Sequence, residues 1–261
     1  MTSPNIHPTA IIDPTAKIPA SCVVGPYCVI GADVELGENC RLQSHVAIEG
    51  PTRIGSDNNF FPFGAIGLAP QDVTYKGEPT RLEIGDHNEI REYVTLNRGT
   101  LKGGGLTKIG SHLLIMAYTH VGHDCIIGDH VMLVNGATLG GHVVVEEWAV
   151  VGALCPVHQF VRIGAHSYIG GGTTITQDVL PFSMTSAARE THAYLMNKVG
   201  LQRRGFSKER IAKIHRAYKI LLASKLNTSQ ALEKLKSEPD RGDDVEMLIR
   251  FIEASERGVI K

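Results

Sequence analysis

The sequence predicts a mainly β protein, a parallel β-helix of hexapeptide repeats followed by a C-terminal α-helical domain. An aliphatic residue occupies every sixth position over residues 6–54, 84–96 and 109–175. A small or β-branched residue, such as Ala10 or Thr119, follows most of these positions by four. Beyond Leu180-Pro181 the period ends and the composition becomes typical of helices.

A period of six fits neither an amphipathic helix nor an alternating strand, so it indicates an internal repeat. Each hexapeptide supplies one short strand and one turn, and three of them complete a triangular coil of 18 residues. The aliphatic residue and its small partner point into the prism, where each coil covers the next. Residues 18 apart should therefore lie one above another, roughly 4.8 Å apart.

Composition sets the domain organisation and excludes several classes of function. With 261 residues and 43 % hydrophobic content, we expect a β-helix over residues 1–185 and a helical domain over 186–261. The formal charge of −1 gives no field that would attract nucleic acid or an anionic membrane. No stretch of 18 apolar residues is present, and the repeat begins at residue 6, so we expect no membrane span, no secretion signal and a cytoplasmic protein.

The five cysteines occupy the small inward position of their repeats. They are Cys22, Cys28, Cys40, Cys125 and Cys155, each four residues after an aliphatic position. Free cysteine behaves there as a small buried apolar residue. A disulfide framework or a metal cluster would show different spacing, so we expect reduced core thiols.

Two insertions interrupt the repeat. Residues 67–81 lack the hexapeptide pattern and contain two prolines, which predicts a loop projecting from one corner of the prism. Residues 97–108 contain Gly103-Gly104-Gly105, which predicts a mobile turn. Solenoid proteins often carry function on insertions, although either segment is also compatible with an ordinary surface loop.

The C-terminal segment predicts three helices. Ser207 can cap one running to about Ser224, Thr228 or Ser229 can start a second, and Asp243 a third ending near Arg257. Between Arg189 and Lys219 there are nine Lys or Arg residues against two Glu. This excess fits either a solvated face or a docking surface for an acidic partner or phosphates.

Histidines gather on one edge of the predicted prism. Val121, Leu139 and Val157 are 18 residues apart and should form successive levels of one column. The polar residues predicted along this edge are His120, His123, His142, His158, Gly141 and Gln159, with Gly141 directly above His123. Ordinary surface positions explain His7, His45, His87, His112 and His130.

Three interpretations of the clustered histidines are open. They can be surface residues, or a three-histidine zinc site like that of the γ-type carbonic anhydrases. In the third interpretation, one histidine takes a proton from a hydroxyl that attacks a thioester. A glycine N–H then stabilises the oxyanion.

The motifs around the cluster favour acyl transfer. They are residues 119–125 (THVGHDC), 135–142 (NGATLGGH) and 157–160 (VHQF), with further matches at 71–72 (QD), 77–81 (GEPTR), 163–166 (IGAH) and 203–206 (RRGF). Together they resemble the UDP-N-acetylglucosamine O-acyltransferases of lipid A biosynthesis, which belong to the hexapeptide acyltransferase superfamily. The β-helices of that superfamily wind left-handed, against the usual right-handed crossover preference.

The resemblance implies an acyl-carrier-protein-dependent transferase that places a 3-hydroxyacyl chain on the 3-hydroxyl of UDP-N-acetylglucosamine, the first step of lipid A biosynthesis. It implies no cofactor besides the phosphopantetheine that the carrier protein brings. By the same resemblance His123 is the general base, Asp124 holds or polarises its imidazole, and the Gly141 N–H is the oxyanion donor.

The resemblance also implies the substrate contacts and the assembly. The residues that would position the sugar and its nucleotide are Asp72, His120, His142, His158, Gln159, Asn197, Arg203 and Arg204. Gly171 would form the floor of the acyl groove, where side-chain size limits chain length. Family members are homotrimers with the active site between neighbouring prisms. This chain departs from the family pattern at Thr74, where a Lys is common, and at Val199, where a Glu is usual.

Other functions remain as alternatives at this stage. The N-acyltransferase of the same pathway, and enzymes acting on 3-amino sugar nucleotides, share the prism. The former carries an extra N-terminal domain, whereas here residue 6 already belongs to the repeat. A coenzyme A-dependent acetyltransferase lacks the basic helical tail and the HxxHDC match. A non-enzymatic scaffold would not need the aligned histidines.

Overall fold

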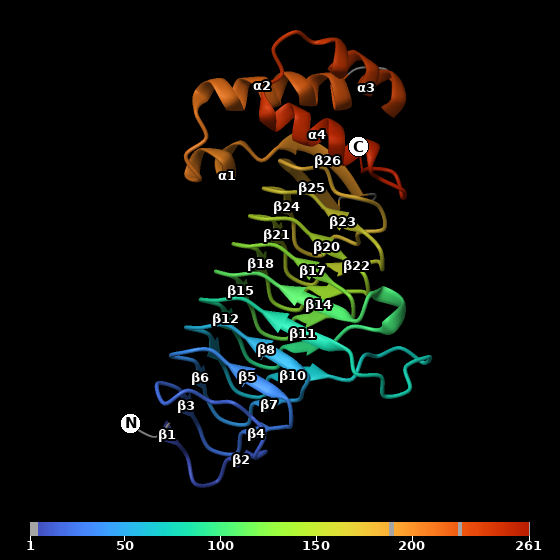
Figure 1. Ribbon diagram of the computed structural model, residues 1–261. Helices are drawn as coiled ribbons and strands as arrows, with labels where there is room; N and C mark the ends of the chain where they lie inside the picture. Colours follow the sequence, from blue (N-terminus) through green and yellow to red (C-terminus); the bar gives the residue numbers. More distant parts are fainter. Residues whose placement is uncertain (1–4, 188–190, 224–225, 261) are drawn as a thin grey trace.

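The computed structural model describes residues 5–187, 191–223 and 226–260. Short parallel strands stack into a three-sided prism, with β1 near one end and the C-terminal helices covering the other (Figure 1). We call the three faces sheets A, B and C, and name each corner by the two sheets that the chain joins there. The prism predicted from the period of six is confirmed.

Sheet A contains β1 (Asn5–Ile6), β3 (Val23–Val24), β6 (Arg41–Leu42), β9 (Asn59–Phe60), β12 (Glu89–Ile90), β15 (Leu114–Ile115), β18 (Met132–Leu133), β21 (Val150–Val151), β24 (Tyr168–Ile169), β25 (Ser183–Ala187) and β26 (Thr191–Met196). Sheet B contains β2 (Ile11–Ile12), β4 (Val29–Ile30), β7 (Ala47–Ile48), β10 (Ala65–Leu68), β13 (Thr95–Asn97), β16 (His120–Val121), β19 (Thr138–Leu139) and β22 (Pro156–Val157). Sheet C contains β5 (Val34–Leu36), β8 (Thr52–Ile54), β11 (Arg81–Ile84), β14 (Leu106–Ile109), β17 (Ile126–Ile127), β20 (Val144–Val145) and β23 (Arg162–Ile163).

The strand register follows the 18-residue spacing. Val121 pairs with Leu139, and Leu139 pairs with Val157, in parallel register. The predicted column is therefore present, and corner residues that are 18 apart lie on successive coils.

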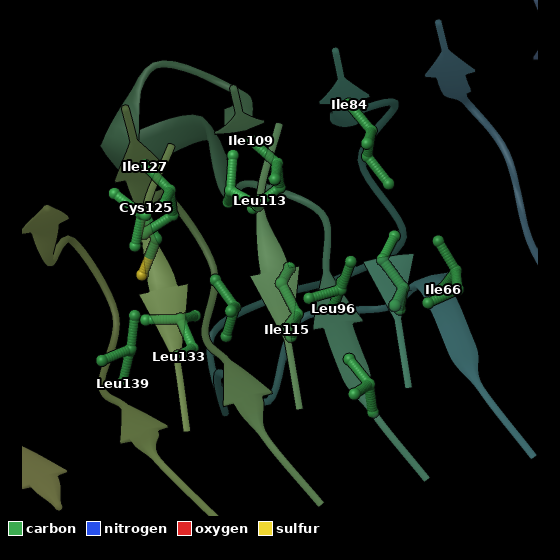
Figure 2. Close-up of a cluster of buried hydrophobic side chains, with 14 of the residues drawn as sticks. Ile66, Ile84, Leu96, Ile109, Leu113, Ile115, Cys125, Ile127, Leu133 and Leu139 are labelled. Carbon is green, nitrogen blue, oxygen red and sulfur yellow. The ribbon is translucent and has the colours of Figure 1, made fainter. Parts of the chain in front are cut away.

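The prism core consists of the stacked aliphatic residues (Figure 2). Ile115, Leu133 and Leu139 are completely buried, whereas Ile6 in the first coil is 37 % exposed because no coil lies beneath it. All five cysteines are buried and unbridged, as predicted. The Cys125 thiol donates to the Gly140 carbonyl at 3.2 Å, and burial raises its pKa to about 12.

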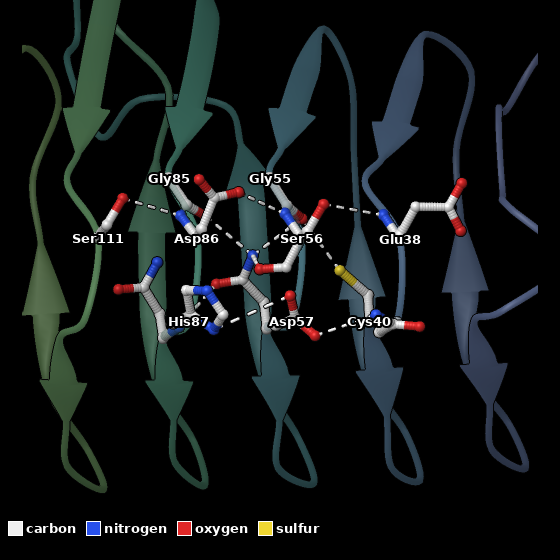
Figure 3. Close-up of polar contacts among 12 residues, drawn as sticks. Glu38, Cys40, Gly55, Ser56, Asp57, Gly85, Asp86, His87 and Ser111 are labelled. Atoms are coloured by element: carbon white, nitrogen blue, oxygen red, sulfur yellow. Dashed lines mark hydrogen bonds and ion pairs between the residues drawn. The ribbon is translucent and has the colours of Figure 1, made fainter.

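Polar side chains link successive coils at the C–A corner (Figure 3). Ser56 Oγ accepts from the Glu38 N–H at 3.1 Å, and the Ser56 N–H donates to Asp86 Oδ1 at 2.6 Å. The Asp86 N–H in turn donates to Ser111 Oγ at 3.0 Å. Each bond joins neighbouring levels, so the backbone donors of the corner are satisfied by the coil above.

Histidines on the same corner form a stack. The rings of His87 and His112 lie 4.9 Å apart, and those of His112 and His130 lie 4.8 Å apart, all nearly parallel. These three histidines lie at the surface, as expected, but they are stacked on one another rather than scattered. His112 and His130 are 18 residues apart, so the spacing that predicted the other column also indicated this one.

Both insertions leave the prism at the B–C corner, on the same side of the molecule (Figure 1). The first joins β10 to β11 and projects as predicted. Arg98 ties it to the second, since its guanidinium donates to the Tyr75 hydroxyl and, at 2.7 Å, to the Gly67 carbonyl. The second insertion contains the 3₁₀ turn η1 (Leu101–Gly103). It was expected to be a mobile turn, but it is bonded to the prism through Asp124.

The described residues of the C-terminal domain form four α-helices. They are α1 (Lys198–Arg203), α2 (Lys208–Tyr218), α3 (Thr228–Ser237) and α4 (Asp243–Glu253), with a π-helical turn, η2 (Lys219–Ala223), after α2. Ser207 caps α2 as predicted, with its side chain accepting from the Arg210 N–H. Helices α3 and α4 begin at the predicted residues.

Three details of this domain differ from the prediction. Helix α1 and the antiparallel β25–β26 hairpin were not predicted, and α4 ends four residues before Arg257. The expected helix end near Ser224 lies outside the described residues, as does Arg189 in the basic segment.

The apolar residues of the domain form a second cluster separate from the prism core, running from Leu180 to Ile252. Ile260 instead joins the prism core, so the chain end returns to the β-helix. The predicted division at residue 185 stays an interpretation, and β25 extends across that position. None of the helices described in the structure is long and apolar enough to cross a membrane.

Candidate active site

The candidate site lies at the B–C corner, directly after β16. His123 and Asp124 occupy the turn between β16 and β17, and the two insertions reach the same corner from the preceding coils. Asp124 has a positive φ of 61°, which directs its carboxylate back toward the second insertion. Such a conformation is uncommon for residues other than glycine and is better tolerated by Asp than by most.

Asp124 is the most enclosed group of the site. Its side chain is 1 % exposed. The Thr100 N–H donates to Asp124 Oδ1 and the Thr100 hydroxyl donates to Oδ2, both at 2.7 Å. The Asp124 N–H donates to Thr107 Oγ1, also at 2.7 Å. Buried carboxylates require such donors, so the second insertion fixes the position of this charge.

The imidazole of His123 is oriented by Asp124. His123 Nδ1 lies 2.7 Å from Asp124 Oδ2. A carboxylate can only accept, so Nδ1 carries the hydrogen in this pair and a neutral ring leaves Nε2 with a free lone pair. The His123 side chain is 16 % exposed, so this second nitrogen remains within reach of a ligand.

Gly141 lies over the His123 ring, as the spacing predicts. A Cβ built on Gly141 would stand 2.5 Å from His123 Cε1 and 2.7 Å from Nε2. Any side chain at this position would therefore cover the free nitrogen. Within the described residues no acceptor lies in hydrogen-bonding range of the Gly141 N–H, so this donor is available.

Two further histidines border the pair. The His142 ring lies 5.2 Å from the His123 ring, edge to face, and stacks on Phe160 at 4.3 Å. Burial lowers the pKa of His142, an effect that the nearby Asp124 charge partly offsets. His120 Nδ1 lies 2.7 Å from Thr95 Oγ1, and burial lowers its pKa as well, with a smaller contribution from His123. Both rings are thus favoured as neutral hydrogen-bonding groups.

The projecting loop brings Asp72 to this cluster. Asp72 Oδ1 accepts from the Thr74 N–H at 2.8 Å and from the Thr74 hydroxyl at 2.9 Å. These bonds lower the pKa of Asp72, and the charges of Lys102 and His123 lower it further. Asp72 is half-buried, and it lies close enough to His123 for the two charges to interact.

His158 and Gln159 lie farther along the same edge and are exposed. His158 Nδ1 contacts the Gln159 carbonyl at 3.0 Å, and Arg257 donates to that same carbonyl at 3.0 Å. Both side chains can therefore meet a ligand that extends from His123 toward the helical domain.

The remaining predicted residues lie away from the B–C corner. Gly171 is exposed at the A–B corner, on the far side of sheet B. Arg204 lies near the C–A corner, with its guanidinium 5.4 Å from the Trp148 ring. Asn197 caps α1 and donates to the His166 carbonyl at 3.0 Å, and Arg203 is exposed at the end of that helix. A single chain does not bring these four residues to His123.

The donor set of the cluster fits a metal ion poorly. His123, Asp124 and His142 each offer one ligand atom, and these atoms lie within 4.8 Å of one another. However, both oxygens of Asp124 already accept hydrogen bonds, from Thr100 and from His123. Binding a cation would break the Nδ1 hydrogen bond that orients His123. A zinc site therefore has less support than a hydrogen-bonded His–Asp pair.

Sequence reasoning missed the residues that hold the carboxylate. Thr100 and Thr107 lie in the second insertion, which was interpreted as a mobile turn. Gly103 of that turn packs on Asp124 so closely that a Cβ would lie 2.0 Å from its Cγ. A glycine run that interrupts a strict repeat just before the HxxHDC motif was the available signal.

Comparison with known proteins agrees with this geometry. A family model described as UDP N-acetylglucosamine O-acyltransferase, domain 2, matches residues 178–260, and one described as bacterial transferase hexapeptide (six repeats) matches residues 106–141. A protein named LpxA from Acinetobacter baumannii is 44 % identical, with 98 % of this chain and 100 % of that chain covered and a TM-score of 0.94. A UDP-N-acetylglucosamine acyltransferase from Francisella novicida is 40 % identical, with 98 % and 93 % covered and a TM-score of 0.95. A UDP-N-acetylglucosamine O-acyltransferase from Moraxella catarrhalis is 40 % identical, with 98 % and 100 % covered and a TM-score of 0.94.

The predicted fold class, a left-handed parallel β-helix with a C-terminal helical domain, is confirmed.

Proposed function

The chain belongs to the UDP-N-acetylglucosamine O-acyltransferase family, and we propose that it transfers a 3-hydroxyacyl chain from acyl carrier protein to the 3-hydroxyl of UDP-N-acetylglucosamine in lipid A biosynthesis. The observation that carries the proposal is the His123–Asp124 pair beneath Gly141. It supplies a base and an oxyanion donor at one point of the surface. Acyl transfer to a hydroxyl requires both.

In the proposed reaction, His123 Nε2 removes the proton of the sugar hydroxyl as its oxygen attacks the thioester carbon. Asp124 keeps Nδ1 protonated and stabilises the imidazolium that forms. The tetrahedral oxyanion accepts a hydrogen bond from the Gly141 N–H. When the C–S bond breaks, the imidazolium returns its proton to the departing phosphopantetheine thiolate, so the base is restored. Every step uses groups of the chain or the two substrates, and we propose that no metal or further cofactor takes part.

The substrate contacts follow from the placement of the neighbouring side chains. His120 and His142, favoured as neutral rings, can donate to or accept from sugar hydroxyls. Asp72 can accept from the sugar, and the exposed His158 and Gln159 can meet the nucleotide farther along the edge. We propose these roles for all five residues.

A homotrimer would bring the remaining residues to the site. Gly171, Asn197, Arg203 and Arg204 lie at other corners or at the end of the prism, so they would serve a neighbouring chain's His123. A symmetric trimer repeats one interface three times, so each chain can contribute these residues to the site of its neighbour. Sedimentation analysis should give a trimeric mass. Mixed trimers of His123→Ala and Arg204→Ala chains should also regain activity that neither variant has alone.

The five buried free thiols fit a reducing compartment, and we propose that the enzyme acts in the cytoplasm. The proposed reaction is tested by incubating purified protein with UDP-N-acetylglucosamine and acyl carrier proteins that carry 3-hydroxyacyl chains of graded length. We expect the mass of the acylated sugar nucleotide for one preferred length. If only a 3-amino sugar nucleotide or coenzyme A thioesters react, the proposed acceptor or donor is wrong. The zinc alternative is tested by metal analysis of the purified protein, together with an assay of carbon dioxide hydration.

A further inference from the structure

Lys102 lies at the rim of the proposed site, although no motif of the sequence indicated it. It belongs to η1, and the next residue, Gly103, packs directly on the Asp124 carboxylate. The turn that holds Asp124 therefore also fixes the position of the Lys102 backbone. The Lys102 ammonium donates to Thr74 Oγ1 at 3.0 Å, so the side chain reaches across to the projecting loop.

This contact connects Lys102 to Asp72. The Thr74 hydroxyl accepts from Lys102 and itself donates to Asp72 Oδ1 at 2.9 Å. The charges of Lys102 and His123 both act on Asp72 and lower its pKa. Lys102, Asp72 and His123 are thus close enough to interact electrostatically.

The Lys102 ammonium has unused capacity for an anion. Its observed partner is a neutral hydroxyl, and among the described residues no carboxylate forms an ion pair with it. An ammonium has three donors, so two remain for a ligand. Arg98, another cation between the two insertions, already donates to the Gly50 and Gly67 carbonyls and the Tyr75 hydroxyl, and it lies 3.8 Å from a Glu49 oxygen. Arg98 therefore serves the fold, whereas Lys102 is available.

We propose that Lys102 binds a phosphate group of a substrate during the proposed reaction. Both substrates of that reaction carry one, since the sugar nucleotide contains a diphosphate and the acyl donor contains the phosphodiester of phosphopantetheine. A lysine ammonium binds phosphate as a point charge and gains strength from charge-assisted hydrogen bonds. This inference rests on the proposed function and assigns to that site a cation from the second insertion, which contacts the projecting loop at Thr74.

The test compares the full-length variants Lys102→Gln, Lys102→Arg and Lys76→Gln with the wild type. Lys76 is an exposed lysine of the projecting loop whose backbone N–H bonds to Glu78, and it serves as the matched control. Loss of a charged hydrogen bond should raise the relevant KM about tenfold or more in Lys102→Gln. We expect kcat to change less than about twofold, since the base and oxyanion donor are untouched. Lys102→Arg should stay close to wild type, as should Lys76→Gln.

Two ligand series identify the phosphate. Calorimetric titration with UDP should show a weaker Kd in Lys102→Gln if the diphosphate is bound. If Lys102 instead binds the phosphate of the acyl donor, the Kd for UDP should stay unchanged in Lys102→Gln. The wild type should then prefer acyl-phosphopantetheine to acyl-pantetheine, and Lys102→Gln alone should lose this preference. Adding Thr74→Lys to Lys102→Gln should restore the lost affinity, because it returns an ammonium to the same point.

The inference is overturned if neither substrate's KM changes in Lys102→Gln, or if kcat alone falls, which would mean that Lys102 only supports the Asp124 turn. It is also overturned if Lys76→Gln shows the larger change in KM. Failure of the wild type to acylate UDP-N-acetylglucosamine would instead contradict the proposed function, and the UDP titration would still report on Lys102.

Discussion

The His123 imidazole and the Asp124 carboxylate are neighbours in the chain and are hydrogen-bonded through Nδ1 and Oδ2 at 2.7 Å. Adjacent residues seldom pair in this way, and here the left-handed backbone of Asp124 makes it possible. The carboxylate is also held from its other side by Thr100. The pair therefore fixes one tautomer of His123 and directs Nε2 to the space beside Gly141.

Replacing His123 by Ala should leave the fold intact and lower kcat by about 10²–10⁴, the usual contribution of a general base. His123 is partly exposed, so its loss leaves no buried cavity. Steady-state kinetics with acyl carrier protein and UDP-N-acetylglucosamine measure the effect. His45→Ala, an exposed histidine at the A–B corner, is the control. Near-native kcat in a folded His123→Ala protein would exclude the proposed base.

Replacing Asp124 by Asn tests the orienting role separately. The amide keeps the shape but can turn its NH₂ toward Nδ1, which would favour the wrong tautomer of His123. We expect kcat to fall on the order of 10² while the KM values change little. Circular dichroism establishes that the coil is intact. A larger effect on KM than on kcat would show that Asp124 acts on binding rather than on the base.

The period of six was sufficient to predict the prism, because every coil repeats one packing solution. Val121, Leu139 and Val157 could be assigned to one column from their spacing alone, and the position of Gly141 over His123 followed. The same rule, applied to His112 and His130, would have revealed the second histidine column.

The contacts made by the insertions could not be predicted in this way. Asp72, Thr100 and Lys102 reach the site through segments without periodicity, and their placement depends on long-range hydrogen bonds such as that between Lys102 and Thr74. The β25–β26 hairpin was missed for a similar reason, since it extends sheet A antiparallel after the repeat has ended. Local pattern predicts repeated packing, whereas irregular segments are fixed by tertiary contacts.

Gly171→Met should shift donor preference to shorter acyl chains without abolishing activity. A side chain fits at Gly171 with a small shift, because a Cβ would lie 3.3 Å from the Ala153 carbonyl oxygen and at ordinary contact distance from the Ala153 nitrogen and Cβ. The added side chain would occupy space that the end of the acyl chain needs, at about 0.8 kcal/mol for each methylene displaced. A series of acyl carrier protein donors measures the preference, with Gly171→Ala expected to be intermediate. An unchanged preference would show that the side-chain size at residue 171 does not limit the length of the acyl chain.

The buried His166 should make stability depend on pH. Burial, with a further contribution from the Arg204 charge, lowers the pKa of His166 to about 4. At pH values between about 4 and the unfolded-state pKa near 6.5, His166 binds a proton in the unfolded chain but not in the folded one. The stabilisation from His166 is therefore complete above about pH 6.5 and declines as the pH falls toward 4, by roughly 3 kcal/mol.

His166→Phe should remove this dependence, because the ring stays in the stack between Trp148 and Phe182 but cannot titrate. Phenylalanine also occupies positive-φ corner positions at Phe63 and Phe160, so the backbone at 166 should accept it. Thermal unfolding from pH 7 to pH 4 measures the change, with His130→Phe as the control in the same column. If acidification lowers the Tm of His166→Phe and that of the wild type equally, another group controls the loss of stability in acid.

Cations of the basic segment that are not paired with a carboxylate should contribute more to docking of the acyl carrier protein than cations that are paired. Arg210 pairs with Asp244 at 2.8 Å, and Lys213 pairs with Asp240 at 2.8 Å, so these charges are largely compensated. Lys208 is exposed and borders a groove of about 370 Å³ with an apolar floor that includes Met196 and Ile211. Arg216 is exposed on the adjacent face, closer to the Asp240 charge.

Lys208→Glu should therefore raise the KM for acyl carrier protein, an acidic helical domain, more than Arg216→Glu does. The KM for UDP-N-acetylglucosamine and kcat should stay near wild type, because surface complementarity acts mainly on the association rate. Added salt should raise the wild-type KM for the carrier protein steeply, since the Debye length is only ~8 Å near physiological ionic strength. This salt dependence should weaken in Lys208→Glu. Lys234→Glu on α3, exposed and outside the groove, is the control. Equal KM values and equal salt dependence in all three variants and the wild type would show that the donor docks on another face.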